Sequence, residues 1–453
     1  MTPVATPPAP PTPEQQRTMS LSTWEGSLTV VFGNWTSGMV LAGYLAYYGG
    51  APWHFAMIGS IPLLAQMACP VAAWIHSMYP RPQRLTELFV LLGRGVWFIP
   101  VLFFLFSVDR ANIPNALLGF LIFASVFGAM AGTIWTGWMG AVVPEHLRGR
   151  YFGTRNAIHA FVGMAAVLGA GWFLDHVPAP HGFIALFGLA TVLALVACSM
   201  FRLHYEPKIP AAPLPFRETF TAPLRDKNFR KFLLFAVYWQ ASVQLASVFV
   251  YPFLQNHLKL TYTQIAIWFS LAAMTTLLAG PIWGRIADRY GNKFVLSVTT
   301  VIAGLLMPLS WILATPGDPT MIYVSGVLDG LGWSGVNPGM FNLLLETSQK
   351  KKSRVAFIGM LSLMTGISGF IGGALAAPLL GFLDQFPQDI GGKEWVGYHW
   401  LFLISMLLRM QAWQLLKPIH EDDAWRTRDV LRLSLSWGLG TFTGLMKRPK
   451  KGA

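Results

Sequence analysis

Long apolar runs recur along the whole chain of 453 residues and limit what it can fold into. Most are long enough to cross a hydrocarbon core of about 30 Å, which takes about 20 helical residues. Backbone polar groups have no water partners in lipid, so such runs have to be helices. We expect an all-α membrane protein with twelve transmembrane helices, at residues 21–48, 53–76, 84–107, 112–140, 154–174, 182–203, 229–255, 262–286, 293–314, 319–345, 354–382 and 396–416.

The distribution of charge supports this interpretation. Charged residues make up only 12% of the chain, against about 25% in a typical soluble protein. The net charge of +13 could suit a nucleic-acid binder, but the basic residues lie in short loops between apolar runs, so we expect no nucleic-acid partner. With both termini in the cytoplasm, only Arg110, Lys259 and Lys393 of the 33 Lys and Arg residues fall in external loops. The positive-inside rule therefore predicts a multi-pass inner-membrane protein with cytoplasmic termini.

Two related halves are predicted from the order of the spans. Two six-helix bundles, 21–203 and 229–416, flank a Pro-rich basic linker at 204–228, predicted to be cytoplasmic. The Pro-rich segment 1–20 is predicted to be a disordered cytoplasmic tail. The basic segment 417–453 is interpreted either as a frayed tail or as an interfacial helix. Anionic lipid is the expected partner of the basic loops and tail.

One cytoplasmic loop carries a recognisable motif. The segment after the eighth predicted span reads GRIADRYGNK over 284–293. It resembles the loop motif of the major facilitator superfamily, G-x-x-x-D-R-x-G-x-K/R, and lies where that family places its second copy. The resemblance implies two pseudo-symmetric six-helix halves that rock around a central site. The matching residues are Gly284, Asp288, Arg289, Gly291 and Lys293.

These loop residues predict a cytoplasmic gate. Asp288 can accept hydrogen bonds from a helix N-terminus, where the helix dipole favours an anion. Arg289 can bridge to an acid such as Glu346 at the end of span 10, and Arg354 follows in the next loop. Such contacts would hold the cytoplasmic side shut and break when it opens. The alternative is a basic topogenic loop with a turn glycine.

The first half departs from the family pattern. Alignment of Pro70 with Pro281 places Ala73, Ser77 and Met78 where the motif has Gly, Asp and Arg. The family's Arg in span 4 is also missing from LLGFLIFASVFGAMAG. These departures favour the C-terminal half as the place of ion coupling.

Span 10 contains an acid near the middle of the membrane. Asp329 lies about ten residues into the span, and ionisable groups at this depth are costly enough to be functional candidates. Trp333 and Asn337 follow at four-residue steps, so the three share a helix face. They are candidate substrate or proton sites, and the alternative for Asp329 is a buried acid satisfied by a neighbouring helix.

Four other polar residues within spans are candidates for binding substrate or protons. Glu25 resembles in placement the span-1 carboxylate of some proton-coupled drug exporters, and its alternative is a helix N-terminal acid. Arg94 needs an acid or carbonyl partner in either role. Gln240 and Gln244 could bind a polar substrate or bond between helices. Arg409 is interpreted as a structural residue that reaches the membrane interface.

The predicted function is secondary active transport of a small-molecule substrate by alternating access, coupled to protons, by a monomer. The alternative is a transporter-like membrane sensor or assembly factor without transport activity. An enzyme is not predicted, since the sequence lacks a phosphate-binding loop, HExxH and a nucleophile elbow. Cys69 and Cys198 lie inside apolar runs and predict neither a disulfide nor a metal site, and no cofactor is expected.

Overall fold

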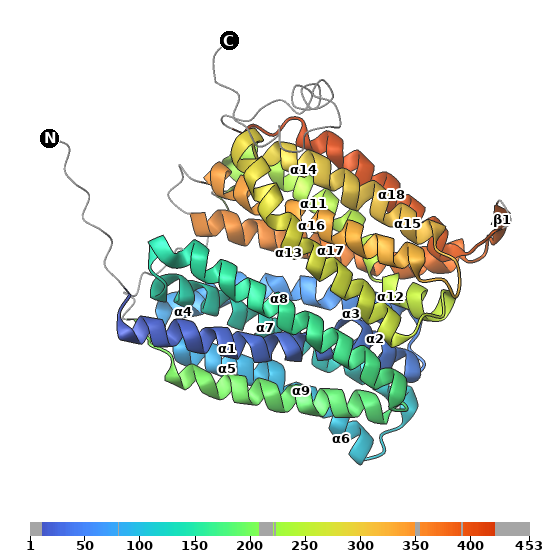
Figure 1. The fold of residues 1–453 in the computed structure, drawn as a ribbon, viewed down its shortest axis with the longest axis horizontal. Helices are drawn as coiled ribbons and strands as arrows, with labels where there is room; N and C mark the ends of the chain where they lie inside the picture. The colour runs from blue at the N-terminus through green and yellow to red at the C-terminus, as the bar shows by residue number, and fades with distance from the viewer. Residues whose placement is uncertain are drawn as a thin grey trace, which may run out of the picture.

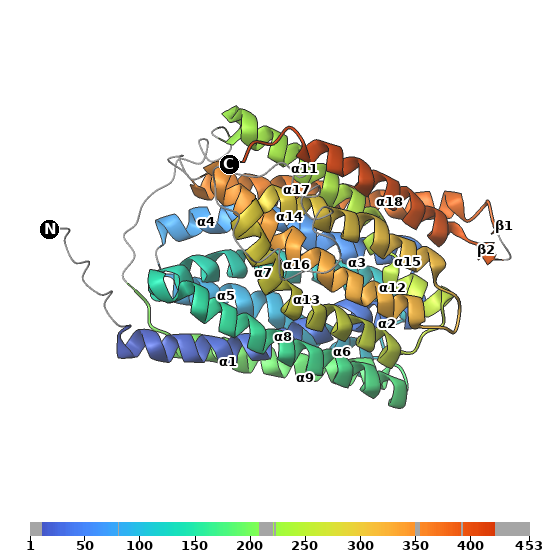
Figure 2. The ribbon, with the colours of Figure 1, turned by 45° about the horizontal axis from the view of Figure 1, so that its top comes forward.

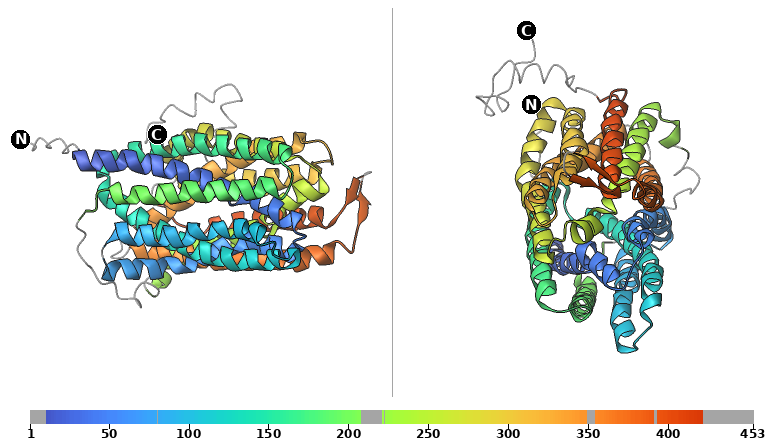
Figure 3. Two further views of the ribbon diagram at one scale, coloured as in Figure 1. Left: turned by 90° about the horizontal axis from the view of Figure 1, so that it is seen from below. Right: turned by 90° about the vertical axis from the view of Figure 1, so that its right-hand side faces the viewer.

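The computed structural model is a bundle of long helices in two halves (Figure 1). It describes residues 11–79, 81–207, 221, 223–348, 354–390 and 393–421. The helices of the N-terminal half, blue to green, lie below the yellow-to-red helices of the C-terminal half in the end-on view (Figure 3, right). Most of the long helices run in roughly the same direction across the molecule (Figure 2).

The N-terminal half runs from Pro13 to Leu203. Its elements are α1 (Pro13–Trp35), α2 (Gly38–Tyr47), α3 (Pro52–Leu64), η1 (Ala65–Ala68), α4 (Cys69–Met78), α5 (Pro82–Gly95), η2 (Val96–Phe98), α6 (Ile99–Leu105), η3 (Arg110–Asn112), α7 (Ile113–Val142), α8 (Glu145–His176), α9 (His181–Met200) and η4 (Phe201–Leu203).

The C-terminal half runs from Lys227 to Leu416. Its elements are α11 (Lys227–Ser247), α12 (Val250–Pro252), the π-helical η5 (Phe253–His257), α13 (Tyr262–Tyr290), α14 (Asn292–Val301), the π-helical η6 (Ile302–Leu306), α15 (Met307–Leu313), α16 (Thr320–Ser348), α17 (Arg354–Leu383), β1 (Gln388–Ile390), β2 (Lys393–Trp395) and α18 (Gly397–Leu416). The strands form one short antiparallel hairpin in which Asp389 pairs with Glu394.

Several helix boundaries follow from local capping chemistry. Thr12 and Gln15 form a reciprocal capping box at the start of α1, and Thr261 and Gln264 form another at the start of α13. The side chain of Asp226 accepts a hydrogen bond from the first turn of α11. The segment 1–20 was predicted to be disordered, but α1 already begins at Pro13 because Thr12 and the Pro provide a helix start.

The helices confirm the fold class. Nine helical segments in the described part of the chain are long and apolar enough to cross a membrane. The remaining predicted spans, 21–48, 319–345 and 396–416, fall on α1 with α2, on α16 and on α18. The chain is therefore a multi-pass helical membrane protein, and the count of twelve crossings stays a prediction.

The first predicted span is two helices instead of one. It breaks after Trp35, and Gly38 takes a φ of +55°, a conformation that suits glycine. A Cβ on Gly38 would also lie 2.7 Å from Oη of Tyr251 in the other half. Thr36 and Ser37 donate their hydroxyls to backbone carbonyls one turn earlier, at 2.8 and 2.6 Å. The break therefore brings the end of α1 and the start of α2 against the C-terminal half.

The halves meet most closely away from the chain ends. We call the end where α1 begins and α18 ends the terminal end, and the opposite end the distal end (Figure 1). Near the distal end, a Cβ on Gly171 of α8 would lie 2.8 Å from the backbone oxygen of Tyr262 in α13. Nearer the middle, a Cβ on Gly366 of α17 would lie 2.6 Å from the backbone oxygen of Leu63 in α3. Glycine at these positions permits close helix approach across the interface.

Candidate functional site

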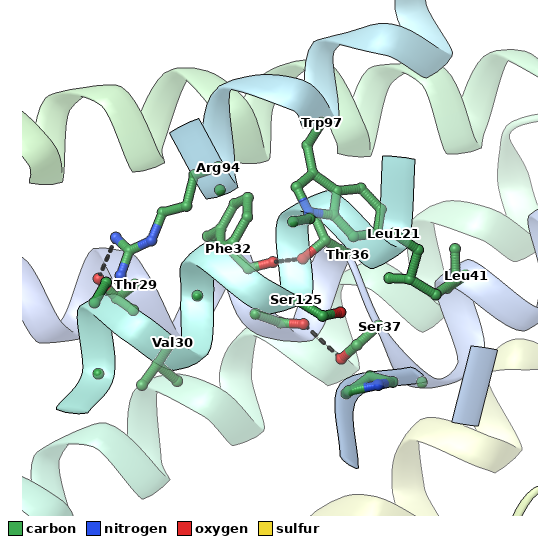
Figure 4. Close-up of a pocket in the computed structure, with 18 of the residues that line it drawn as sticks. Thr29, Val30, Phe32, Thr36, Ser37, Leu41, Arg94, Trp97, Leu121 and Ser125 are labelled. Atoms are coloured by element: carbon green, nitrogen blue, oxygen red, sulfur yellow. Dashed lines mark hydrogen bonds between the residues drawn. The ribbon is translucent and has the colours of Figure 1, made fainter. Parts of the chain in front are cut away.

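A cavity of about 660 Å³ extends between and within the bundles. This volume lies in the range of small-molecule sites, about 300–1,000 Å³. Most of its lining comes from α1, α2, α3, α5, α7 and α8 of the N-terminal half, and α11 and α12 close it from the C-terminal half. Figure 4 shows the part of the lining around the break between α1 and α2.

A polar cluster of Glu25, Thr29 and Arg94 lies on this cavity, and Figure 4 shows Thr29 and Arg94 of this cluster. Thr29 donates its hydroxyl to Oε1 of Glu25 at 2.7 Å and accepts a hydrogen bond from Nη1 of Arg94 at 2.8 Å. Nη1 of Arg94 also lies 3.8 Å from Oε1 of Glu25. The guanidinium of Arg94 stands 5.6 Å from the ring centre of Phe32. Two sequence candidates, Glu25 and Arg94, are thus brought together, and the carboxylate is the partner that Arg94 needed.

A second arginine lines the cavity on α8. The guanidinium of Arg155 lies over the ring of Trp135 with its carbon 4.5 Å from the ring centre. Its Nε donates to the backbone oxygen of Ser22 at 3.4 Å. Glu25 also acts on it electrostatically, although the two are not in direct ion-pair contact. Arg155 was not a candidate in the sequence because it lies at the start of a predicted span, where basic residues are common.

His159 lies one turn after Arg155 and also lines the cavity. Its Nε2 is 3.2 Å from the backbone oxygen of Thr23 on α1. A Cβ on Gly26 would overlap atoms of both His159 and Arg155, so glycine at this position lets the two side chains approach α1. The i, i+4 spacing of the arginine and the histidine was the sequence signal for this shared face.

The rest of the lining is mainly apolar and rich in glycine. Phe32 and Trp97 meet edge to face at the centre of the part shown in Figure 4, with ring centres 6.3 Å apart. A Cβ on Gly33, Gly128 or Gly132 would meet nothing within 4 Å. These three residues therefore leave room in the cavity that a larger side chain would fill.

The two glutamines of α11 lie apart from this polar cluster. Gln244 lines the cavity and donates Nε2 to the backbone oxygen of Gly59 at 2.9 Å, which is a bond between the halves. Gln240 lies against Gly369 of α17 and is absent from the cavity lining. The contacts of both fit the interhelical alternative.

The span-10 candidates lie outside the cavity lining. Trp333 meets Trp239 edge to face, with ring centres 6.1 Å apart, and Asn337 is exposed. Asp329 lies beside Trp333 and interacts electrostatically with Arg409 and with Tyr251, a residue of the cavity wall. Asp329 and Trp333 therefore have their contacts within the C-terminal half or with the cavity wall, whereas Asn337 is exposed, and none of the three lines the cavity.

The prediction that Arg409 reaches the membrane interface was wrong. Its side chain is fully buried, with Nη1 donating to the backbone oxygen of Ala303 at 3.0 Å and Nη2 to that of Val243 at 3.1 Å. The π-helical η6 contains Ala303, and such a bulge frees carbonyls from the helical hydrogen-bond pattern. The buried guanidinium binds these carbonyls from α18, so it points inward.

The loop motif binds the C-terminal segment. Gly291 has a φ of +93° and separates α13 from α14. The first backbone amides of α14, at Asn292 and Lys293, donate to the carboxylate of Glu421 at 2.6 and 2.8 Å. Nζ of Lys293 donates to the carbonyls of Lys417 and Ile419 at 2.8 and 2.7 Å. Glu421 therefore binds the N-terminus of α14, and the role at a helix N-terminus predicted for Asp288 stays a prediction.

The other gate residues are described only in part. Gly284 is exposed on α13, and the guanidinium of Arg289 lies 5.2 Å from the ring centre of Tyr290. The backbones of Asp288, Glu346 and Arg354 lie in α13, α16 and α17, but their side chains fall outside the described part of the structure. The predicted bridge from Arg289 to Glu346 stays a prediction.

The relationship to known proteins follows from a match over most of the chain. The family model described as Major Facilitator Superfamily matches residues 83–251 and 232–441. The chain belongs to the major facilitator superfamily. This confirms the family inferred from the loop motif, which lies inside the second matched region.

Relatives within the superfamily share part of the sequence. A putative proline/betaine transporter of Staphylococcus haemolyticus is 25% identical over 199 residues, which are 42% of this chain and 41% of that protein. The multi-drug resistance efflux pump PmrA of Streptococcus pneumoniae is 31% identical over 199 residues, 42% of this chain and 46% of that protein. The chain thus matches less than half the length of these curated relatives.

A solved structure extends the comparison over the fold. The nucleoside transporter NupG superposes with a TM-score of 0.66 at 14% sequence identity, covering 90% of this chain and 100% of NupG. At this identity the likeness concerns the fold alone.

In the part of the chain that the structure describes, no group of three His, Cys, Asp or Glu side chains could hold a metal ion.

Proposed function

We propose that this superfamily member is a secondary active transporter in the inner membrane that moves a small-molecule substrate by alternating access. The cavity carries this proposal, since it lies between and within two bundles of one fold and is large enough for a small solute. The names of the sequence relatives, a transporter and an efflux pump, support it. By the positive-inside rule, the terminal end would face the cytoplasm.

In the conformation of the structure, the distal end would be the closed side of the transporter. The carboxylate of Asp175, at the end of α8, accepts hydrogen bonds from the amides of Tyr262 and Thr263, both at 2.9 Å. These amides begin α13, so an acid of one half binds the helix N-terminus of the other. We infer that this contact forms when the distal side is closed and breaks when it opens.

Proton coupling would use the N-terminal half. Glu25 is buried and lines the cavity through its contact with Thr29 and Arg94. A proton on this carboxylate would weaken its hold on Arg94 and change the charge of the cavity. We therefore place the coupling proton on Glu25, with Asp329 as the alternative site in the other half.

The test is to fill the cavity without disturbing the packing. Gly132→Val places a branched side chain in open cavity space on α7. The matched control is Gly119→Val on the same helix, which also has open space but does not line the cavity. Both variants are reconstituted in proteoliposomes and assayed for flux over a panel of solutes under a proton gradient.

We expect Gly132→Val to lose most of the solute flux and Gly119→Val to keep it. Equal flux in the two variants would place the transport path outside this cavity. An absence of gradient-driven flux for every solute, with wild-type protein that is folded and correctly inserted, would favour a sensor or assembly factor.

A further inference from the structure

The charges that line the cavity do not balance. Among the described residues that line it, two arginines, Arg94 and Arg155, and one acid, Glu25, carry formal charge. Glu25 forms its ion pair with Arg94 and interacts with Arg155 only at longer range. One positive charge is therefore left over next to a mainly apolar space, where an unbalanced charge is costly.

Arg155 carries this excess charge in a form suited to a ligand. Its hydrogen bond in the described structure uses Nε, and its guanidinium carbon lies 4.5 Å from the ring centre of Trp135. The two Nη groups remain as donors at the cavity wall. A planar pair of donors of this kind matches a carboxylate or a phosphate ester, which accept two parallel hydrogen bonds.

The apolar residues of the cavity wall, which begin beside Arg94 at Phe32, favour a ligand with an apolar body. Phe32, Phe55, Phe89, Val90 and Trp97 supply aromatic and aliphatic surface. The glycines of α1 and α7 add open space between them. Hydroxyls such as Ser37 and Thr36 are occupied by backbone carbonyls, so they compete little for the ligand.

We propose that the cavity binds a small organic anion, with its carboxylate or phosphate on Arg155 and its apolar or aromatic body along Phe32 and Trp97. His159 also lines this part of the cavity, and its Nε2 donates to the backbone oxygen of Thr23, so only a protonated ring would add a donor for the anion. Glu25 forms its ion pair with Arg94, so the anion supplies the negative charge that balances Arg155. This proposal rests on the proposed transport function, because it names the substrate class of the same cavity.

The test compares molecules that share a body and differ in one group. Three sets are used: benzoate, benzamide and benzylamine; 3-phenylpropionate, its amide and its amine; octanoate, its amide and its amine. Each is measured by thermal shift on purified protein and by flux in proteoliposomes. We expect stabilisation and flux with the carboxylates and little response to the amides and amines.

The variants locate the anion on Arg155. Arg155→Gln is expected to weaken carboxylate binding about tenfold to a hundredfold, which is the effect of losing a charged hydrogen-bond partner. Arg155→Lys should keep part of the binding, because the charge stays while the planar pair of donors is lost. The matched control is Arg202→Gln, since Arg202 is exposed, pairs with Glu87 at 2.6 Å and lies outside the cavity.

A second variant tests the same position without removing a charge. Gly26→Ala adds a Cβ that forces the ends of Arg155 and His159 to move. It should weaken carboxylate binding while leaving the charge of the cavity unchanged. This variant keeps the test informative if Arg155→Gln fails to fold.

The outcomes separate this proposal from the proposed function. Flux of amides or amines that equals or exceeds flux of the carboxylates would overturn the anion assignment and leave transport intact. Carboxylate binding that is equally strong in wild type, Arg155→Gln and Gly26→Ala would overturn the assignment to Arg155. Carboxylate binding that depends on Arg155 without any flux would support the anion site and contradict transport.

Discussion

The charged residues inside the membrane have different surroundings in the two halves of this protein. In the C-terminal half, Arg409 is fully buried against two backbone carbonyls and Asp329 lies within its electrostatic reach, away from the cavity. In the N-terminal half, Glu25, Arg94 and Arg155 all line the cavity. The difference teaches that a charge inside the membrane marks a candidate site only when it opens onto a space that a solute can fill.

This comparison predicts that the C-terminal charges matter most for stability. Arg409→Met should lower the free energy of unfolding by about 3–5 kcal/mol, because the buried carbonyls of Ala303 and Val243 lose their charged donor. Arg94→Met should cost less, since Glu25 keeps Thr29 and contact with the cavity. Thermal and denaturant unfolding of the purified variants measures both effects.

The electrostatic interaction between Asp329 and Arg409 can be tested in the same series. Adding Asp329→Asn to Arg409→Met should restore part of the lost stability, because the uncompensated acid is then neutral. A double variant whose losses simply add would show that Asp329 and Arg409 do not depend on each other. Loss of proton-coupled flux in Asp329→Asn, with stability unchanged, would assign the coupling proton to the C-terminal half instead of to Glu25.

The N-terminal acid is expected to act on transport. Glu25→Gln should reduce concentrative, proton-driven uptake about tenfold or more and flatten its dependence on pH, because the group proposed to exchange the proton is gone. Glu87→Gln is the matched control, since Glu87 lies in the same half, pairs with exposed Arg202 and does not line the cavity. Uptake is measured in proteoliposomes over a range of internal and external pH.

The pH series on Glu25→Gln also tests its surroundings. The titratable and charged groups that interact with Glu25 are Arg94 on α5, Arg155 on α8, Cys198 on α9 and His204 after η4. Tyr151 and His159, also on α8, interact with Arg155. If the pH dependence survives in Glu25→Gln, one of these neighbours carries the proton instead. Unchanged uptake in both Glu25→Gln and Glu87→Gln would remove the coupling role from this cluster.

The smallest effect is expected where the halves meet. Asp175→Ala removes two acceptors from the N-terminus of α13 and should favour opening of the distal end by about 0.5–2 kcal/mol, as for loss of a helix cap. Spin labels placed on each half at the distal end would report a longer mean distance. Asp384→Ala is the matched control, since Asp384 binds the amide of Gly397 within one half at 2.9 Å.

An equal change of distance in both variants would mean that Asp175 does not join the halves. A change confined to Asp175→Ala would show that the acidic side chains of the N-terminal half act across the interface as well as in the cavity. Either result shows whether the acids of the N-terminal half differ in this way from Asp329, whose electrostatic partner Arg409 lies in its own half.

The sequence was sufficient to predict the fold class and the family. Apolar runs of membrane length and basic loops are local patterns, and lipid allows few structures other than helices. The motif at 284–293 named the family that the match over 83–251 and 232–441 confirms. Local chemistry also sets several helix starts, although Thr12 and Pro13 began α1 earlier than its hydropathy indicated.

The site depended on contacts that no local pattern encodes. Asp329 is an acid near the middle of a predicted span, as expected of a functional residue. It nevertheless lies outside the cavity lining and interacts electrostatically with Arg409 of another helix. Arg155 resembled an ordinary loop cation until Gly26 and Trp135 placed it at the cavity wall. Amino-acid type determined which charges enter the membrane, and tertiary packing alone decided which of them meet a partner and which meet open space.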